Sequence, residues 1–202
     1  MALPFSPLIV FAASQGGMDA LCRIVCHFPA DFPATIAIVL HTHESSPRYL
    51  AKILAEHTSL AVAYAVDGDE LVTGQIFVAP PGAHLVIQPN HCFGLDQGPK
   101  VNYTRPAADC LFTTAAQVMG HQVIGVVLTG GDGDGSQGLK KIKEHGGRSV
   151  VQSPADSRAP SMPITAIVHD SPDHIAMLDE MGPLLKALVE ADAAGQGRLA
   201  TV

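Results

Sequence analysis

Short apolar runs rich in β-branched residues alternate with amphipathic stretches in the first part of the chain. Parallel strands that are buried on both faces and joined by crossover helices produce this alternation. The pattern therefore predicts a β-α-β-α unit, with Ser46 as the N-cap of its second helix and Pro47 in that helix's first position. The four expected elements are a strand over 8–12, a helix over 18–27, a strand over 36–40 and a helix over 46–57.

The middle of the chain has a different pattern, in which short apolar runs are separated by turn residues rather than by helical stretches. We expect these runs to form antiparallel ribbons inserted into the α/β fold. They cover residues 61–65, 75–79, 84–88 and 92–95.

The last part of the chain returns to alternating strands and helices. A helix is expected from Arg105-Pro106 to Met119, because Gly120 is a typical residue just beyond a helix end. The remaining expected elements are a strand over 123–128, a helix over 138–145, a strand over 149–152, a strand over 175–178 and a helix from Asp179 to about residue 191.

Length and composition indicate one folded domain over residues 1–202, with 47% hydrophobic residues and a formal charge of −7. No run of basic residues offers a surface for phosphates, so nucleic acid and anionic membranes are not expected partners. No apolar run approaches the roughly 18 residues of a membrane span. The apolar start lacks a basic leader, and the four cysteines do not form a disulfide framework. We expect a cytoplasmic protein.

Three side chains with complementary chemistry follow predicted strands: Ser14 after the first, His41 after the second, and Asp134 after the run that ends at Leu128. Ligands of an open parallel sheet bind at the carboxyl ends of its strands. Taken alone, each residue is typical of a cap, a core histidine or a turn. Together they supply a nucleophile, a general base and a carboxylate that orients the base.

The surroundings of Ser14 favour a nucleophile. Residues 12–17, Ala-Ala-Ser-Gln-Gly-Gly, are close to a Gly-x-Ser-x-Gly elbow at a turn from strand to helix. The N–H groups at the start of such a helix can stabilise an oxyanion. The chain order Ser, His, Asp differs from that of the α/β-hydrolases, chymotrypsin and subtilisin.

The glycine loop around Asp134 also permits another interpretation. Gly133, Gly135 and Gly138 form Gly-x-Gly-x-x-Gly between a strand and a helix, which is the pattern of a dinucleotide-binding protein. Asp132 and Asp134 argue against it, because two carboxylates would lie where a pyrophosphate should bind. At about 4 Å, like charges repel by roughly 4 kcal/mol even at an effective dielectric constant of 20.

With these motifs in place, the chain resembles the catalytic domain of the CheB family of chemotaxis protein-glutamate methylesterases over about residues 8–190. Residues 13–17 resemble the family's Ala-Ser-Thr-Gly-Gly, Leu40-His41 its Gln-His, and 128–135 its Leu-Thr-Gly-Met-Gly-x-Asp-Gly. Further matches in the same order are Asp67-Gly68, Gly74, Val78-Ala79-Pro80, His84, Val101-Asn102, Arg105-Pro106 and Asp109.

The resemblance implies a doubly wound α/β fold of Rossmann-like three-layer type, with a mostly parallel sheet and an antiparallel ribbon insertion. It implies catalytic roles for Ser14, His41 and Asp134, with Asp132 as the acid only if the loop alignment is offset by two residues. It places oxyanion stabilisation at the backbone of Gln15, Gly16 and Gly131, where the family has Thr and Met in place of Gln15 and Gly131. Asn102 and Arg105 are candidates for substrate binding or for fixing a helix start.

The implied activity is hydrolysis of glutamate methyl esters on chemoreceptors to glutamate and methanol, with no metal or organic cofactor. The departures at Ala12, Gln15, Gly131 and Asp132 keep open a catalytically weakened binding module of the same family. The family usually carries an N-terminal receiver domain, whereas this chain starts at the first catalytic strand. We therefore expect no phospho-control in cis, which leaves a regulator in trans as a candidate partner.

Overall fold

The computed structural model describes residues 7–199, so residues 1–6 and 200–202 of the predicted domain lie outside the described part. The strands are β1 (Leu8–Ala13), β2 (Thr35–Leu40), β3 (Ala61–Tyr64), β4 (Gln75–Val78), β5 (His84–Ile87), β6 (Phe93–Asp96), β7 (Val123–Val127), β8 (Arg148–Gln152) and β9 (His174–Ala176). The α-helices are α1 (Gly17–Val25), α2 (Leu50–Ala55), α3 (Ala108–Met119), α4 (Ser136–Glu144), α5 (Ser161–Asp170) and α6 (Leu178–Leu199), and a short 3-10 helix spans Gly120–Gln122.

Seven strands form one parallel sheet in the order β3-β4-β2-β1-β7-β8-β9, and β5 and β6 form a separate antiparallel ribbon. The sheet is wound in both directions from its centre, because the chain runs outward from β1 to β2 and later returns to pair β7 with β1. The predicted fold class is confirmed. In a sheet of this kind the ligand site is expected where the winding direction changes, at the carboxyl ends of β1 and its neighbours.

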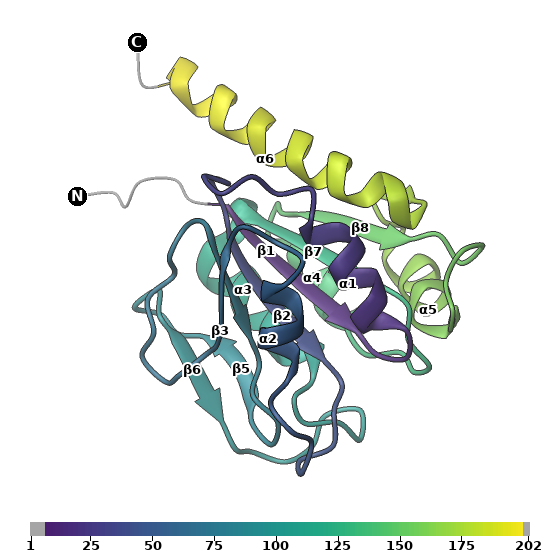
Figure 1. Ribbon diagram of the computed structural model, residues 1–202. Coiled ribbons are helices and arrows are strands. Elements are labelled where there is room, and N and C mark those ends of the chain that lie inside the picture. Colours follow the sequence, from purple (N-terminus) through teal and green to yellow (C-terminus); the bar gives the residue numbers. More distant parts are fainter. Residues whose placement is uncertain (1–6, 200–202) are drawn as a thin grey trace.

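Helices cover both faces of the sheet (Figure 1). One buried cluster packs α1, α2 and α6 against the sheet, and the other packs α3, α4, α5 and the ribbon against the opposite face. Every residue of β1 and β2 is buried, which explains why these strands are continuous apolar runs rather than alternating ones. Their carboxyl ends are therefore held rigidly.

Two expectations drawn from the sequence are wrong. β3 and β4 are parallel and belong to the main sheet, and only β5 and β6 form an antiparallel ribbon. The four apolar runs have similar lengths and similar turn residues between them, so their pattern carries no information on strand direction. The second helix begins at Leu50 rather than at Ser46-Pro47, which lie in the preceding turn.

Toward the C-terminus, α5 was not expected at all. It supplies the crossover from β8 to β9, and its buried side chains Met162 and Ala166 are spaced by one helical turn. Pro160 and Pro163 make this segment resemble a loop in the sequence, although Pro is tolerated in the first turn of a helix. Within residues 7–199, no helix is both long and apolar enough to cross a membrane.

Candidate active site

Ser14 and His41 follow neighbouring strands at the same edge of the sheet. Ala13 pairs with Leu40 in the β1–β2 register, and the N–H of His41 donates to the carbonyl oxygen of Ala13 at 3.0 Å. On the other side of β1, the N–H of Ser14 donates to the carbonyl oxygen of Thr129 at 3.0 Å. The structure thus brings together the three strand ends that the sequence singled out.

The turn from β1 into α1 depends on two glycines. Gly16 has φ of 83°, in the left-handed region that favours glycine, and a Cβ at Gly17 would lie 2.6 Å from that of Ala13. Thr129 Oγ1 braces the turn by donating to the carbonyl oxygen of Gln15 at 2.9 Å. Ser14 is therefore held on a sharp turn between strand and helix, as predicted from its motif.

Asp134 is buried and fixed by four donors. Its Oδ2 accepts from His41 Nε2 at 2.7 Å and from the N–H of Ala108, while its Oδ1 accepts from Asn102 Nδ2 and the N–H of Asp109, both at 3.1 Å. Burial raises the pKa of Asp134, but the hydrogen bonds from His41 and the two N–H groups outweigh it, so the pKa is lowered overall. Asp134 therefore stays ionised beneath His41.

His41 lies between two carboxylates. Besides the bond to Asp134, its Nδ1 lies 3.0 Å from Asp132 Oδ2, and only 8% of the imidazole is exposed. Burial lowers the pKa of His41, but hydrogen bonds and charges from Asp132 and Asp134 more than compensate and raise it to about 9. The arrangement therefore favours a protonated imidazole at neutral pH.

Ser14 is next to this assembly without being bonded to it. Its hydroxyl makes no hydrogen bond to any residue from 7 to 199, whereas Asp132 occupies the ring nitrogen of His41 that does not face Asp134. The N–H groups of Gln15, Gly16 and Gly131 likewise have no acceptor among these residues. Gly131 is exposed, and a Cβ there would meet only Gln15 Oε1, at 3.7 Å.

The other two predicted site residues lie in the 101–105 segment. Asn102 Nδ2 donates both to Asp134 and to Asp109 Oδ2, the latter at 2.9 Å, so it bridges two carboxylates behind the histidine. Arg105 donates to the carbonyl oxygens of Gln97 and Gly98 and pairs with Glu44 at 3.2 Å. Both positions fix loops around the site.

Sequence reasoning missed the part played by Asp109. Its Oδ1 accepts from the N–H of Gly138 at 2.7 Å, which ties the start of α3 to α4. Burial and the charge of Asp134 raise the pKa of Asp109. The residue was part of the family motif, but nothing in its local pattern showed that the first turn of α3 caps Asp134.

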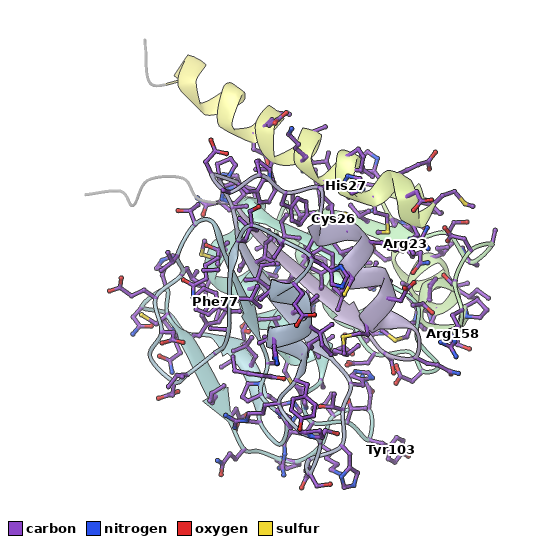
Figure 2. The ribbon with its side chains drawn as sticks, viewed as in Figure 1. Arg23, Cys26, His27, Phe77, Tyr103 and Arg158 are labelled. Carbon is purple, nitrogen blue, oxygen red and sulfur yellow. The ribbon has the colours of Figure 1, made fainter. Side chains whose placement is uncertain are left out.

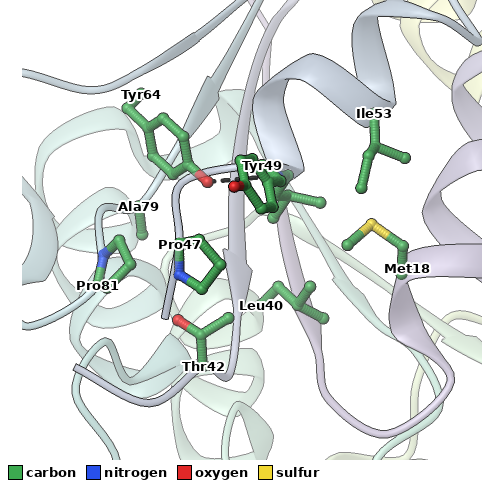
Figure 3. Close-up of a pocket in the computed structure, with 10 residues that line it drawn as sticks. Met18, Leu40, Thr42, Pro47, Tyr49, Ile53, Tyr64, Ala79 and Pro81 are labelled. Atoms are coloured by element: carbon green, nitrogen blue, oxygen red, sulfur yellow. Dashed lines mark hydrogen bonds between the residues drawn. The ribbon is translucent and has the colours of Figure 1, made fainter. Parts of the chain in front are cut away.

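Two hollows flank the strand end that carries His41. The first has a volume of about 230 Å³ and is mainly apolar, with Leu40 and Thr42 in its wall and the hydroxyl of Tyr64 accepting from the N–H of Leu50 (Figure 3). The second, of about 290 Å³, is lined by His41, Thr42, His43, Glu44, Lys100, Tyr103, Thr104 and Arg105. Tyr103 projects from its rim and is 97% exposed (Figure 2).

The loop that resembled a dinucleotide fingerprint is filled by the protein's own carboxylates. Asp109 accepts from the N–H of Gly138, and Asp132 Oδ1 accepts from the N–H of Asp134 at 3.1 Å. A dinucleotide-binding protein also needs an acidic residue about 20 positions after the glycines to bind the ribose, and the carboxylate of Asp156, at that distance, instead accepts from the N–H of Leu178 at the start of α6. Two of the N–H groups that a pyrophosphate would use, those of Asp134 and Gly138, are therefore already bonded to carboxylates.

Comparisons with known proteins agree with this geometry. A family model described as CheB methylesterase matches residues 9–185. A putative protein-glutamate methylesterase/protein-glutamine glutaminase of Leptospira interrogans is 39% identical over 176 residues, which are 87% of this chain and 91% of that protein. The protein-glutamate methylesterase FrzG of Myxococcus xanthus is 36% identical over 93% of this chain. The match covers 56% of the length of FrzG.

A solved structure is similar over nearly the same region. The crystal structure of the Thermotoga maritima CheB methylesterase catalytic domain has a TM-score of 0.85 and 31% identity, covering 91% of this chain and 98% of that one. The resemblance, the fold and the enzyme class predicted from the motifs are thereby confirmed.

Proposed function

Because the chain belongs to the CheB methylesterase family, we propose that it is a serine esterase in which Ser14 is the nucleophile, His41 the base and Asp134 the carboxylate that orients the base. The observation that carries these roles is the convergence of the three strand ends, with His41 bonded to a buried, ionised Asp134. A base oriented by a third group and adjacent to a nucleophile on a sharp turn is the arrangement of a triad.

The reaction follows from these positions. Neutral His41 accepts the Ser14 proton through Nδ1 while Oγ attacks the ester carbonyl, and the free N–H groups of Gln15, Gly16 and Gly131 stabilise the oxyanion. His41 then returns the proton to the departing methoxide, which leaves as methanol. A water molecule, deprotonated by the same imidazole, hydrolyses the acyl-enzyme, which leaves a glutamate side chain on the receptor and regenerates Ser14.

We infer that the substrate is a glutamyl methyl ester on a chemoreceptor. The hollows beside His41 are smaller than the roughly 300–1,000 Å³ pockets that enclose drug-sized ligands, so they suit a short side chain presented by another protein. We expect this reaction in the cytoplasm, with residues 1–202 acting as one catalytic domain.

An active-site phosphonate tests the nucleophile directly. We expect one molar equivalent to label wild-type protein at Ser14 and none to label Ser14→Ala. The variant should keep wild-type stability, because the hydroxyl makes no hydrogen bond within the described residues. Membranes bearing methyl-labelled chemoreceptors should release volatile methanol with the wild type only.

Two results would contradict the proposal. Absence of labelling and of methanol release would favour the binding module, which chemoreceptor pull-down with Ser14→Ala would then identify. Rapid Ser14-dependent hydrolysis of long-chain acyl esters without methanol release would leave an esterase but exclude the chemoreceptor substrate.

A further inference from the structure

Both ring nitrogens of His41 are bonded to carboxylates, which is an unusual state for a general base. Nε2 is 2.7 Å from Asp134 Oδ2 and Nδ1 is 3.0 Å from Asp132 Oδ2. A base that activates a hydroxyl must present a bare ring nitrogen to it. With Nδ1 bonded to Asp132, the Ser14 hydroxyl has no acceptor on the imidazole.

Asp132 is held in this position by both of its oxygens. While Oδ2 contacts His41, Oδ1 accepts from the N–H of Asp134 two residues later, an Asx-type turn that aims the carboxylate back at the ring. In the family motif that the 128–135 loop resembles, the corresponding position is a glycine. This chain therefore has a carboxylate where the resemblance predicts no side chain.

The two carboxylates differ in how easily they can move. Asp134 is fully buried and has four donors, whereas the side chain of Asp132 is 36% exposed and has two partners. Glycines flank it at 131 and 133, and a Cβ at Gly131 would touch nothing closer than 3.7 Å. When Asp132 leaves His41 it gives up only its own two partners, because none of the four donors to the Asp134 carboxylate comes from Asp132.

We propose that Asp132 is a positioning residue that competes with Ser14 for Nδ1 of His41, so that the enzyme rests with its base engaged by Asp132 and becomes competent only when this carboxylate moves away. The proposal rests on the proposed function, because it assigns a competitor to the Ser14–His41 contact. In the step to the competent state, the imidazolium loses its Nδ1 proton to water, and the bare nitrogen then accepts the hydrogen bond of the Ser14 hydroxyl.

The charges around His41 make the resting state dominant at neutral pH. With a pKa of about 9, only about 1% of His41 is neutral at pH 7, and each unit by which the pKa falls raises that fraction about tenfold. The titratable or charged groups that face this site, besides Asp132 and Asp134, are Asp109 and Cys110 on α3 and His43, Glu44, Lys100, Tyr103 and Arg105 around the polar hollow.

The test is the pH dependence of kcat/KM for a small activated ester such as p-nitrophenyl acetate, from about pH 5 to 10. Wild type should gain activity with a midpoint near pH 9. Asp132→Gly and Asp132→Asn should shift the midpoint down by a unit or more and raise activity at pH 7 about tenfold. Glu56→Gln, at the exposed end of α2, removes the same charge far from His41 and should leave the midpoint unchanged.

A histidine ¹⁵N spectrum gives a second readout that a purely structural role would not change. The protonation midpoint of His41 Nδ1 should lie near pH 9 in wild type and a unit or more lower in Asp132→Asn. An unchanged midpoint, or a fall in activity at every pH with folding intact, would overturn the proposal. Retained activity when Ser14→Ala is added to Asp132→Gly would instead overturn the proposed function, so the two failures are distinguishable.

Discussion

Replacement of Asp134 by Asn should damage both turnover and stability. The carboxylate accepts from four donors, two on each oxygen, whereas the amide offers one oxygen and one NH2 group. Whichever way the amide faces, two donors lose their acceptor and meet another donor instead. Because a hydrogen bond to a charged group contributes roughly 1.5–3 kcal/mol, we expect a loss of about 3 kcal/mol or more in unfolding free energy.

The effect on catalysis is larger than the effect on folding. When the NH2 group of the new amide faces the ring, Nε2 of His41 has no acceptor there, and the imidazole loses the tautomer that directs its other nitrogen toward Ser14. Replacing the orienting Asp of a serine triad by Asn lowers kcat about 10⁴-fold in the best-studied case, and we expect a similar factor here. Urea titration and ester hydrolysis at a temperature where the variant remains folded measure the two effects separately.

Asp109→Asn is the matched control for this experiment. It changes a neighbouring carboxylate on α3 that also bonds Asn102 and a backbone N–H, but makes no hydrogen bond to His41. It should cost stability while retaining most of the turnover. The reasoning is refuted if Asp134→Asn keeps turnover within about tenfold of Asp109→Asn, because His41 would then not depend on Asp134 for its orientation.

Three further predictions concern close packing, an open position and pH. Gly138→Ala should cost about 1–3 kcal/mol in urea titration, because the new methyl group would overlap Phe112 where α4 crosses α3. Gly131→Ala should change stability by no more than about 0.5 kcal/mol, since its Cβ meets only Gln15; a larger loss would show that the loop is packed more tightly. Because folding raises the pKa of His41 to about 9, protonated His41 contributes stability that is complete below the pKa of the unfolded chain, near 6.5, and is lost as pH rises through about 9. The melting temperature should therefore fall between these pH values, and it should fall less in Asp132→Asn.

The ends of the central strands were the most predictable part of the molecule. β1, β2 and β7 are buried on both faces, so each is a continuous apolar run whose end can be placed to within a residue. Since parallel strands end at one edge, the proximity of Ser14, His41 and the 128–135 loop followed from the sequence. The parallel pairing of β3 with β4 did not, because short runs contain no information about direction.

Contacts that depend on side chains from distant elements could not be predicted. The contact between Asp132 and His41 spans 91 positions, and the caps on Asp134 come from the first turn of α3. The sequence placed Asp132 in a glycine-rich loop but gave no sign that its side chain contacts His41. The sequence therefore indicated which loops meet. Only the structure shows which carboxylate contacts which ring nitrogen of His41.

The central position of β1 in the sheet has a bearing on how the protein is made. β1 leaves the ribosome long before its partner β7, which begins only at Val123, and Leu8 pairs with Val123 in the finished sheet. Long-range parallel pairing of this kind folds slowly, because a large loop must close before the contact forms. One edge of an entirely apolar strand thus stays uncovered until β7 has been synthesised, and an exposed apolar strand edge of this kind makes the nascent chain prone to aggregation during this interval.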